Sequence, residues 1–137
     1  MSYLLDTNVI SELRKGDRAD ATVVAWFDAI ADEEIFLSVL TIAEIRQGVE
    51  RIRRRDPVAG TNLDSWLGRV VDAHRDRLVP VDRLVAEEWG RMNAPDPLPV
   101  VDGLLAATAR VIGHTLATRN VADFARAGVD LVDPFAG

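Results

Sequence analysis

Apolar residues occur along this chain in short runs that alternate with stretches of helical spacing. Five of the runs have the length and the apolar character of strands that are covered on both faces. They are Tyr3–Leu5, Ile35–Ser38, Leu78–Val81, His114–Thr118 and Val129–Val132. Pro80 lacks the N–H group that a central strand needs, so we expect the third run at an edge of the sheet.

Between these runs, apolar residues recur every three or four positions, which is the spacing of a helix with one buried face. The clearest series spans residues 42–52 and consists of Ile42, Ile45, Val49 and Ile52. Further helices are expected within 9–16, 20–30, 61–74, 85–92, 102–112 and 121–125, and three prolines predict a loop over 94–99. The alternation predicts an α/β fold: one three-layer domain over residues 1–137, with a parallel sheet of about five strands flanked by helices.

Composition is that of an ordinary soluble globular protein. Of the 137 residues, 48% are hydrophobic and 28% are charged, and there is no cysteine. The lack of cysteine excludes disulfides and thiolate metal sites and fits a reducing cytosol. No apolar run approaches the roughly 20 residues of a membrane span, and no basic segment precedes an apolar block as in a secretion signal. We therefore expect a cytoplasmic protein without membrane attachment.

The net charge of −6 is unlike that of a typical nucleic-acid binder, which is basic overall. Fifteen of the sixteen basic residues are arginine, and Lys15 is the only lysine. Arginine suits bidentate contacts to phosphate, but it also accompanies GC-rich coding. The distribution of the arginines is therefore more informative than their number.

Four acidic residues fall where an α/β protein places its ligands, near the carboxyl ends of parallel strands. They are Asp6 after the first strand, Glu44 early in the helix after the second, Asp102 at the start of a helix, and Asp123 beyond the fourth strand. Each also has an ordinary explanation. An aspartate at such a junction can be a helix cap, a surface glutamate can pair with an arginine, and Asp123 can be a surface residue or a cap.

Carboxylates that converge in one site repel each other and stay ionised together only if a cation neutralises them. Oxygen ligands favour Mg²⁺ or Mn²⁺ over zinc or copper. The two histidines, His74 and His114, are not near another candidate ligand in the sequence and are expected to be structural. Such a cluster is the usual apparatus of metal-assisted phosphodiester hydrolysis. The chain has no glycine-rich phosphate loop, no Gly-x-Ser-x-Gly turn and no cysteine nucleophile.

At these residues the chain resembles the PIN-domain family, in particular the VapC-like ribonuclease toxins of type II toxin–antitoxin pairs. The resemblance rests on four motifs: LLDTNVI at 4–10, SVLTIAEIRQG at 38–48, DGLLAATA at 102–109 and TRNVADF at 118–124. Their order and spacing extend it over essentially the whole chain. It implies a Mg²⁺- or Mn²⁺-dependent endoribonuclease that is neutralised by a cognate antitoxin, as a homodimer or in a toxin–antitoxin hetero-oligomer.

The resemblance also assigns site residues. Asp6, Glu44 and Asp102 match the three strongest acidic positions of the family, and are the expected catalytic metal ligands. Asn8 and Thr118 match recurrent polar positions that orient carboxylates or water.

The fourth acidic position departs from the family pattern. Many relatives have an acid two residues after the threonine, where this chain has Asn120. Asparagine can ligate a metal through its carbonyl oxygen or hold a water, and Asp123 can supply the missing charge. The identity of the fourth ligand and the number of metal ions stay open.

Arginines on the helix that carries Glu44 are candidates for steering RNA phosphates toward the acidic residues, Arg46 and Arg51 above all. For Arg53–Arg55, ordinary cations at a helix C-terminus are an equal alternative. The apolar face with Trp66, Leu67 and Val70 is expected to be mostly core, with part of it as a groove for an antitoxin helix.

Three other functions stay open. One is a PIN-type RNA- or DNA-processing nuclease without an antitoxin. Another is a phosphoacceptor receiver domain, which is disfavoured because that chemistry needs a lysine late in the chain and the only one is Lys15. The third is an inactive PIN-like binding module, which Asn120 keeps open.

Overall fold

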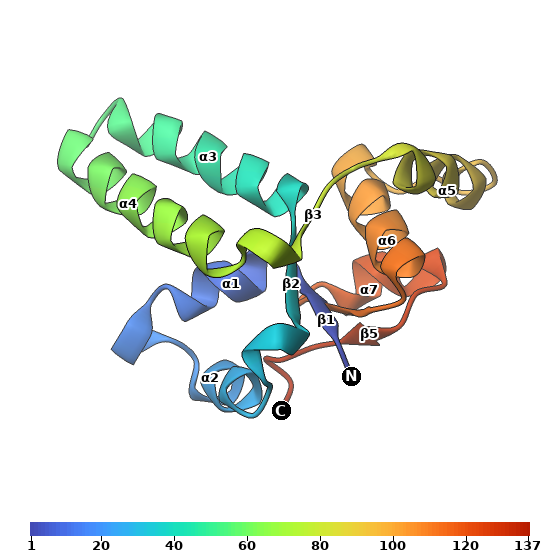
Figure 1. Cartoon of the computed structure of the whole chain (residues 1–137), viewed down its shortest axis with the longest axis horizontal. Helices are drawn as coiled ribbons and strands as arrows, with labels where there is room; N and C mark the ends of the chain where they lie inside the picture. Colours follow the sequence, from blue (N-terminus) through green and yellow to red (C-terminus); the bar gives the residue numbers. More distant parts are fainter.

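The computed structural model describes residues 1–137 and contains seven α-helices around a five-stranded sheet (Figure 1). The strands are β1 (Tyr3–Leu5), β2 (Ile35–Ser38), β3 (Leu78–Val79), β4 (Thr115–Ala117) and β5 (Leu131–Val132). The helices are α1 (Thr7–Leu13), α2 (Ala21–Asp28), α3 (Val39–Arg53), α4 (Pro57–Ala73), α5 (Arg83–Asn93), α6 (Val100–Ile112) and α7 (Val121–Phe124). The α/β class and the five strands predicted from the sequence are confirmed.

All neighbouring strands are parallel, in the order β3-β2-β1-β4-β5. β3 lies at an edge, as Pro80 predicted. Leu5 of the central strand is in register with Leu37 of β2 and Ala117 of β4. Because these strands end at the same level, the segments that follow them leave the sheet side by side.

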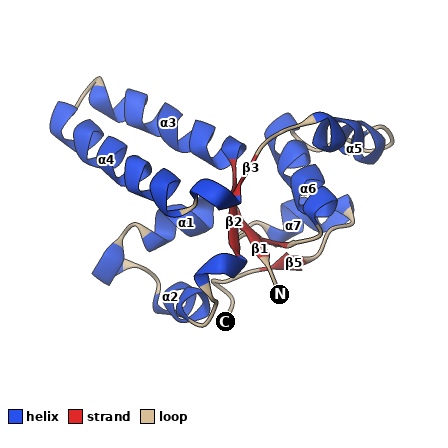
Figure 2. Ribbon diagram, viewed as in Figure 1, coloured by secondary structure: helices blue, strands red, loops and turns tan.

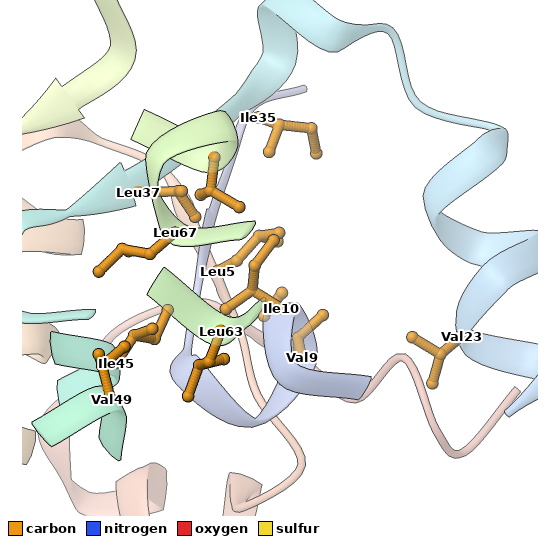
Figure 3. Close-up of a cluster of buried hydrophobic side chains, with 12 residues drawn as sticks. Leu5, Val9, Ile10, Val23, Ile35, Leu37, Ile45, Val49, Leu63 and Leu67 are labelled. Carbon is orange, nitrogen blue, oxygen red and sulfur yellow. The ribbon is translucent and has the colours of Figure 1, made fainter. Parts of the chain in front are cut away.

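Helices cover the sheet on both faces (Figure 2). Successive residues of its strands point to opposite layers. Leu5 packs in a core cluster with apolar residues of α1, α2, α3 and α4 (Figure 3). Leu4 packs in a second cluster with residues of α6 and α7. Figure 1 shows α3 and α4 as an antiparallel pair on one side of the sheet, with α5 and α6 on the other. The three-layer architecture is therefore as predicted.

None of the helices has both the length and the apolar character that crossing a membrane requires.

Several element boundaries differ from the sequence prediction. The third, fourth and fifth strands are shorter than the apolar runs. α4 begins at Pro57 rather than near residue 61, because the Asp56 side chain accepts a hydrogen bond from the Ala59 N–H (3.1 Å) and proline suits the first turn of a helix. α6 begins at Val100, so Asp102 is its third residue and not its N-cap.

α3 and α4 come so close at Gly60 that a larger side chain is not accommodated. A Cβ atom on Gly60 would lie 2.8 Å from Cα and Cβ of Arg53, and backbone cannot move away easily. We expect Gly60→Ala to lower the free energy of unfolding by about 1–3 kcal/mol, measured by urea denaturation. Gly68→Ala in the same helix meets no atom within 4 Å and should raise it by about 0.5–1 kcal/mol, because alanine favours helix. Equal stabilities of the two variants would refute this close approach.

Candidate active site

Asp6 is the residue around which the polar edge of the sheet is built. Its backbone N–H donates to the Ala117 carbonyl (2.9 Å), which continues the β1–β4 pairing one residue beyond the strand. The residue is buried, with 8% of its surface exposed. One carboxylate oxygen accepts from the Thr7 N–H (2.7 Å), and the other accepts from the Thr118 hydroxyl (2.8 Å). Asp6 is therefore a helix cap and a site residue at once.

Glu44 reaches this edge from the second turn of α3. Ser38 caps that helix by accepting from the Leu40 N–H (3.0 Å), which turns α3 away from the end of β2. The hydroxyl of Thr7 donates to a carboxylate oxygen of Glu44 (2.6 Å). This short hydrogen bond joins the start of α1 to α3. Thr7 therefore contacts two of the acids, Asp6 through its N–H and Glu44 through its hydroxyl.

Thr118 and its neighbours fix the other side of Asp6. Asn8 donates through its amide nitrogen to Asp6 (3.3 Å) and to the Thr118 hydroxyl (3.4 Å). Its carbonyl oxygen accepts from the Arg119 N–H (3.2 Å), and the Asn120 N–H donates to the Thr118 hydroxyl (3.0 Å). These contacts surround the Asp6 carboxylate with Asn8 and Thr118, and their role in orienting it for catalysis stays a prediction.

Asp102 and Asp123 face a common hollow. Asp102 lies in the first turn of α6 and is partly buried, whereas Asp123 lies in the first turn of α7 and is exposed. Both line a depression of about 340 Å³ between these helices, together with Arg126. Val100 and Val101, which precede Asp102, are exposed, so the two apolar residues before Asp102 do not enclose it.

Asn120 occupies the N-cap position of α7 but makes no side-chain capping bond. Its side chain is exposed and leaves its carbonyl oxygen available beside Asp123, three residues further on. Both candidates for the fourth ligand thus come from one short helical turn.

The carboxylates influence one another more than any cation influences them. Burial is the main factor that raises the pKa of Asp6, and the charges of Glu44 and Asp102 raise it further, against hydrogen bonds from Thr118 and Thr7 that lower it. Burial also raises the pKa of Asp102, with the charges of Asp123 and Glu44 adding to it. None of the four acids takes part in a salt bridge. Negative charge is therefore concentrated here without compensation.

No three acidic or histidine side chains form a ready-made metal cage in this arrangement. The chemistry of the donors nevertheless fits a hard divalent cation. Asp6 uses its two oxygens for hydrogen bonds but keeps free lone pairs. The side chains of Asp102 and Asn120 form no hydrogen bond within the chain. All the candidate ligand atoms are oxygens, as Mg²⁺ and Mn²⁺ prefer.

Other residues singled out in the sequence have different surroundings. Arg46 is held by Asp64 of α4 (2.9 Å), which also binds Arg53 (2.7 Å), and the two arginines keep the pKa of Asp64 below its usual range. Arg46 is thus a link between α3 and α4, which its sequence position did not reveal. Arg51 forms no salt bridge.

The histidines and the predicted antitoxin face are chiefly structural. His74 contacts the Val70 carbonyl through Nδ1 (2.9 Å). His114 packs edge-on against Phe36, with ring centroids 4.4 Å apart. Leu67 and Val70 are core residues, although Leu67 also lines a surface hollow of about 530 Å³ between α3 and α4.

Sequence reasoning missed Thr41 and Arg126. Thr41 is fully buried and lies 3.4 Å from the Thr7 hydroxyl, oxygen to oxygen. A threonine between Leu40 and Ile42 gives no distinct pattern in the sequence. Arg126 binds the Pro97 carbonyl (2.9 Å) and Asp96 (3.3 Å) and so fixes the proline loop beside Asp102. The only sign in the sequence that Arg126 lies near the site is its spacing of three residues from Asp123.

The chain is similar to proteins of known sequence and structure over nearly its whole length. The PIN domain model matches residues 3–129. A VapC ribonuclease of Sinorhizobium fredii is 34% identical over 139 residues, 96% of either chain. The toxin FitB of Neisseria gonorrhoeae is 32% identical and covers 96% of this chain and 97% of its own. The crystal structure of FitAcB from N. gonorrhoeae has a TM-score of 0.89 at 32% identity, over 97% of this chain and 98% of that one. This chain belongs to the PIN-domain family.

Proposed function

We propose that this protein is the toxin of a type II toxin–antitoxin pair, and that it hydrolyses RNA phosphodiester bonds in the cytoplasm with Mg²⁺ or Mn²⁺. One observation carries the proposal. Four carboxylates from four different elements gather at the carboxyl edge of the sheet, and no arginine or lysine neutralises them. Such a group is costly to the fold unless a cation binds, and a bound divalent cation suits phosphodiester hydrolysis.

The relatives support the activity and the biological role. A VapC ribonuclease and the toxin FitB each match nearly the whole chain at more than 30% identity. FitAcB, and FitAB bound to a DNA fragment, support a cognate antitoxin as the partner. We extend this to a homodimer or a toxin–antitoxin hetero-oligomer as the assembled form.

The chain's own residues would divide the work as follows. Asp6, Glu44 and Asp102 would hold the cation, with the Asn120 carbonyl oxygen or Asp123 as a further ligand. The cation would supply an activated water and would stabilise negative charge on the phosphate. The Thr7 N–H and the Thr118 hydroxyl keep the Asp6 carboxylate in one orientation, while the Thr7 hydroxyl does the same for Glu44.

The decisive experiment incubates the purified protein with a panel of RNAs in the presence of Mg²⁺, Mn²⁺ or EDTA. We expect cleavage with either metal and none with EDTA. Cleavage that persists in EDTA would contradict the metal-dependent mechanism. Growth on expression of the protein, with and without the product of a neighbouring small reading frame, tests the toxin role. A toxin should arrest growth, and its antitoxin should restore it.

Thr118 provides a finer test of this arrangement. Thr118→Val keeps the shape of a fully buried side chain but removes the hydroxyl that donates to Asp6. Residues that orient a metal ligand typically contribute 10- to 100-fold to metal affinity or activity, so we expect the Mg²⁺ concentration for half-maximal cleavage to rise by about that factor. Thr108→Val is the matched control, since buried Thr108 donates only to the Leu104 carbonyl of its own helix. An unchanged Mg²⁺ requirement for Thr118→Val would remove Thr118 from the site.

A further inference from the structure

A second polar hollow lies between α4 and the segment that joins α1 to α2. It has a volume of about 380 Å³ and is lined by Arg14, Arg18, Asn62, Ser65, Trp66 and Arg69. No acidic residue lines it. The α4 residues recur every three or four positions, so one face of that helix forms one wall, and the chain after α1 forms the other.

The three arginines of this hollow carry uncompensated charge. Arg14, Arg18 and Arg69 are exposed and take part in no salt bridge. Most other arginines of the chain have carboxylate partners, among them Arg46 and Arg53. In a protein with a net charge of −6, three free arginines around one depression form a local positive site that attracts anions.

Trp66 adds an aromatic surface to this positive site. The Arg14 guanidinium carbon lies 5.6 Å from the centre of the Trp66 ring, within the range of a cation–π contact. Proteins that bind single-stranded nucleic acid combine such elements: cations follow the phosphates, and bases stack on aromatic rings or guanidinium planes. Asn62 and Ser65 offer neutral hydrogen-bonding groups for a ribose or a base edge.

We propose that this hollow is a phosphate-binding subsite for single-stranded RNA, which holds the substrate at a distance from the cleavage site. The inference rests on the proposed ribonuclease function. α1 connects the two places: Asp6 caps its first turn and Arg14 its last. Its seven residues span about 10 Å, a distance that a few linked nucleotides cover. An acidic peptide would satisfy the arginines but would not stack on Trp66 as a base does, which favours RNA as the ligand.

The test measures binding without cleavage. The anisotropy of a labelled single-stranded oligouridylate is recorded in EDTA, over a series of salt concentrations. Three full-length proteins are compared: the wild type, Arg14→Ala/Arg69→Ala, and the charge-matched control Arg83→Ala/Arg91→Ala on α5, which lies on the other side of the molecule in Figure 1. Circular dichroism melting confirms that each is folded.

We expect the Arg14→Ala/Arg69→Ala protein to bind RNA roughly tenfold more weakly. Its salt slope should be shallower by about 0.7 for each phosphate contact that is lost. The control should bind like the wild type. RNA should also quench tryptophan fluorescence in the wild type, and Trp66→Phe should remove most of that quenching.

Three outcomes would overturn the subsite. The first is an unchanged RNA affinity of the Arg14→Ala/Arg69→Ala protein, and the second is an equal loss of affinity in the control. The third comes from the same measurement with a labelled poly-glutamate peptide: the Arg14→Ala/Arg69→Ala protein loses binding to the peptide but retains binding to RNA. The last result would assign the hollow to an acidic protein partner. These outcomes are distinct from failure of the proposed function, which is read from wild-type cleavage with Mg²⁺. If the wild type cleaves RNA and the Arg14→Ala/Arg69→Ala protein binds RNA with unchanged affinity, only the subsite is refuted and the proposed function stands.

Discussion

Replacing Asp6 with asparagine is expected to lower metal-dependent RNA cleavage by about a thousandfold or more, with the fold preserved. Asparagine is itself a good N-cap and can still accept the hydrogen bond from the Thr7 N–H. It cannot contribute negative charge to a cation. The loss corresponds to about 4 kcal/mol of transition-state stabilisation, at about 1.4 kcal/mol per factor of ten. Cleavage rates under single-turnover conditions with saturating Mg²⁺ measure the effect.

Asp82→Asn is the matched control for this substitution. Asp82 caps α5 by accepting from the Val85 N–H (3.0 Å), as Asp6 caps α1, but it belongs to no acidic group. The control should therefore cleave RNA at the wild-type rate. If Asp6→Asn retained a tenth of the wild-type rate, Asp6 would be a cap and not a metal ligand.

The core of the fold was predictable because its signals are local. Tyr3–Leu5 and Ile35–Ser38 are apolar on both faces, and only a sheet covered on both sides buries such strands. Boundaries were harder to predict, because they depend on competing caps. The start of α4 is an example: a helix was expected from residue 61, and the Asp56 cap with Pro57 begins it four residues earlier.

The candidate site was predictable as a set of residues but not as a set of contacts. Parallel strands that end in register bring Asp6 and Thr118 together, so their proximity follows from the topology alone. The hydrogen bond from Thr7 to Glu44 depends on how α1 packs on α3, which no spacing in the sequence reveals. The same is true of Arg46. Its link to Asp64 requires the α3–α4 pairing, which the sequence does not reveal, and its role toward RNA stays a prediction.

Asp102→Asn is expected to have two opposite effects: a loss of cleavage about as large as that of Asp6→Asn, and a gain in stability of the metal-free protein at neutral pH. Asp102 forms no hydrogen bond or salt bridge, and burial with the charges of Asp123 and Glu44 raises its pKa. Asparagine removes the charge while keeping the shape. In EDTA the midpoint of thermal unfolding should rise by a few degrees.

The gain should depend on pH in a defined direction. A raised pKa means that the folded state binds the Asp102 proton more tightly than the unfolded state. Ionisation of Asp102 therefore lowers the stability of the wild type as the pH rises through the carboxyl range. The advantage of Asp102→Asn should be absent at a pH below that range, should grow as the pH rises, and should be constant near neutrality.

Mg²⁺ should reverse the order of the two proteins. A ligand that binds only the folded state stabilises it, and the wild type offers the more complete site. Saturating Mg²⁺ should therefore raise the unfolding midpoint of the wild type more than that of Asp102→Asn. Asp130→Asn removes the charge of an exposed aspartate that lies on no helix; it controls for the change in net charge and should alter neither quantity. A metal-free Asp102→Asn protein less stable than the wild type at neutral pH would show that Asp102 supports the fold, as an acid in the first turn of a helix can.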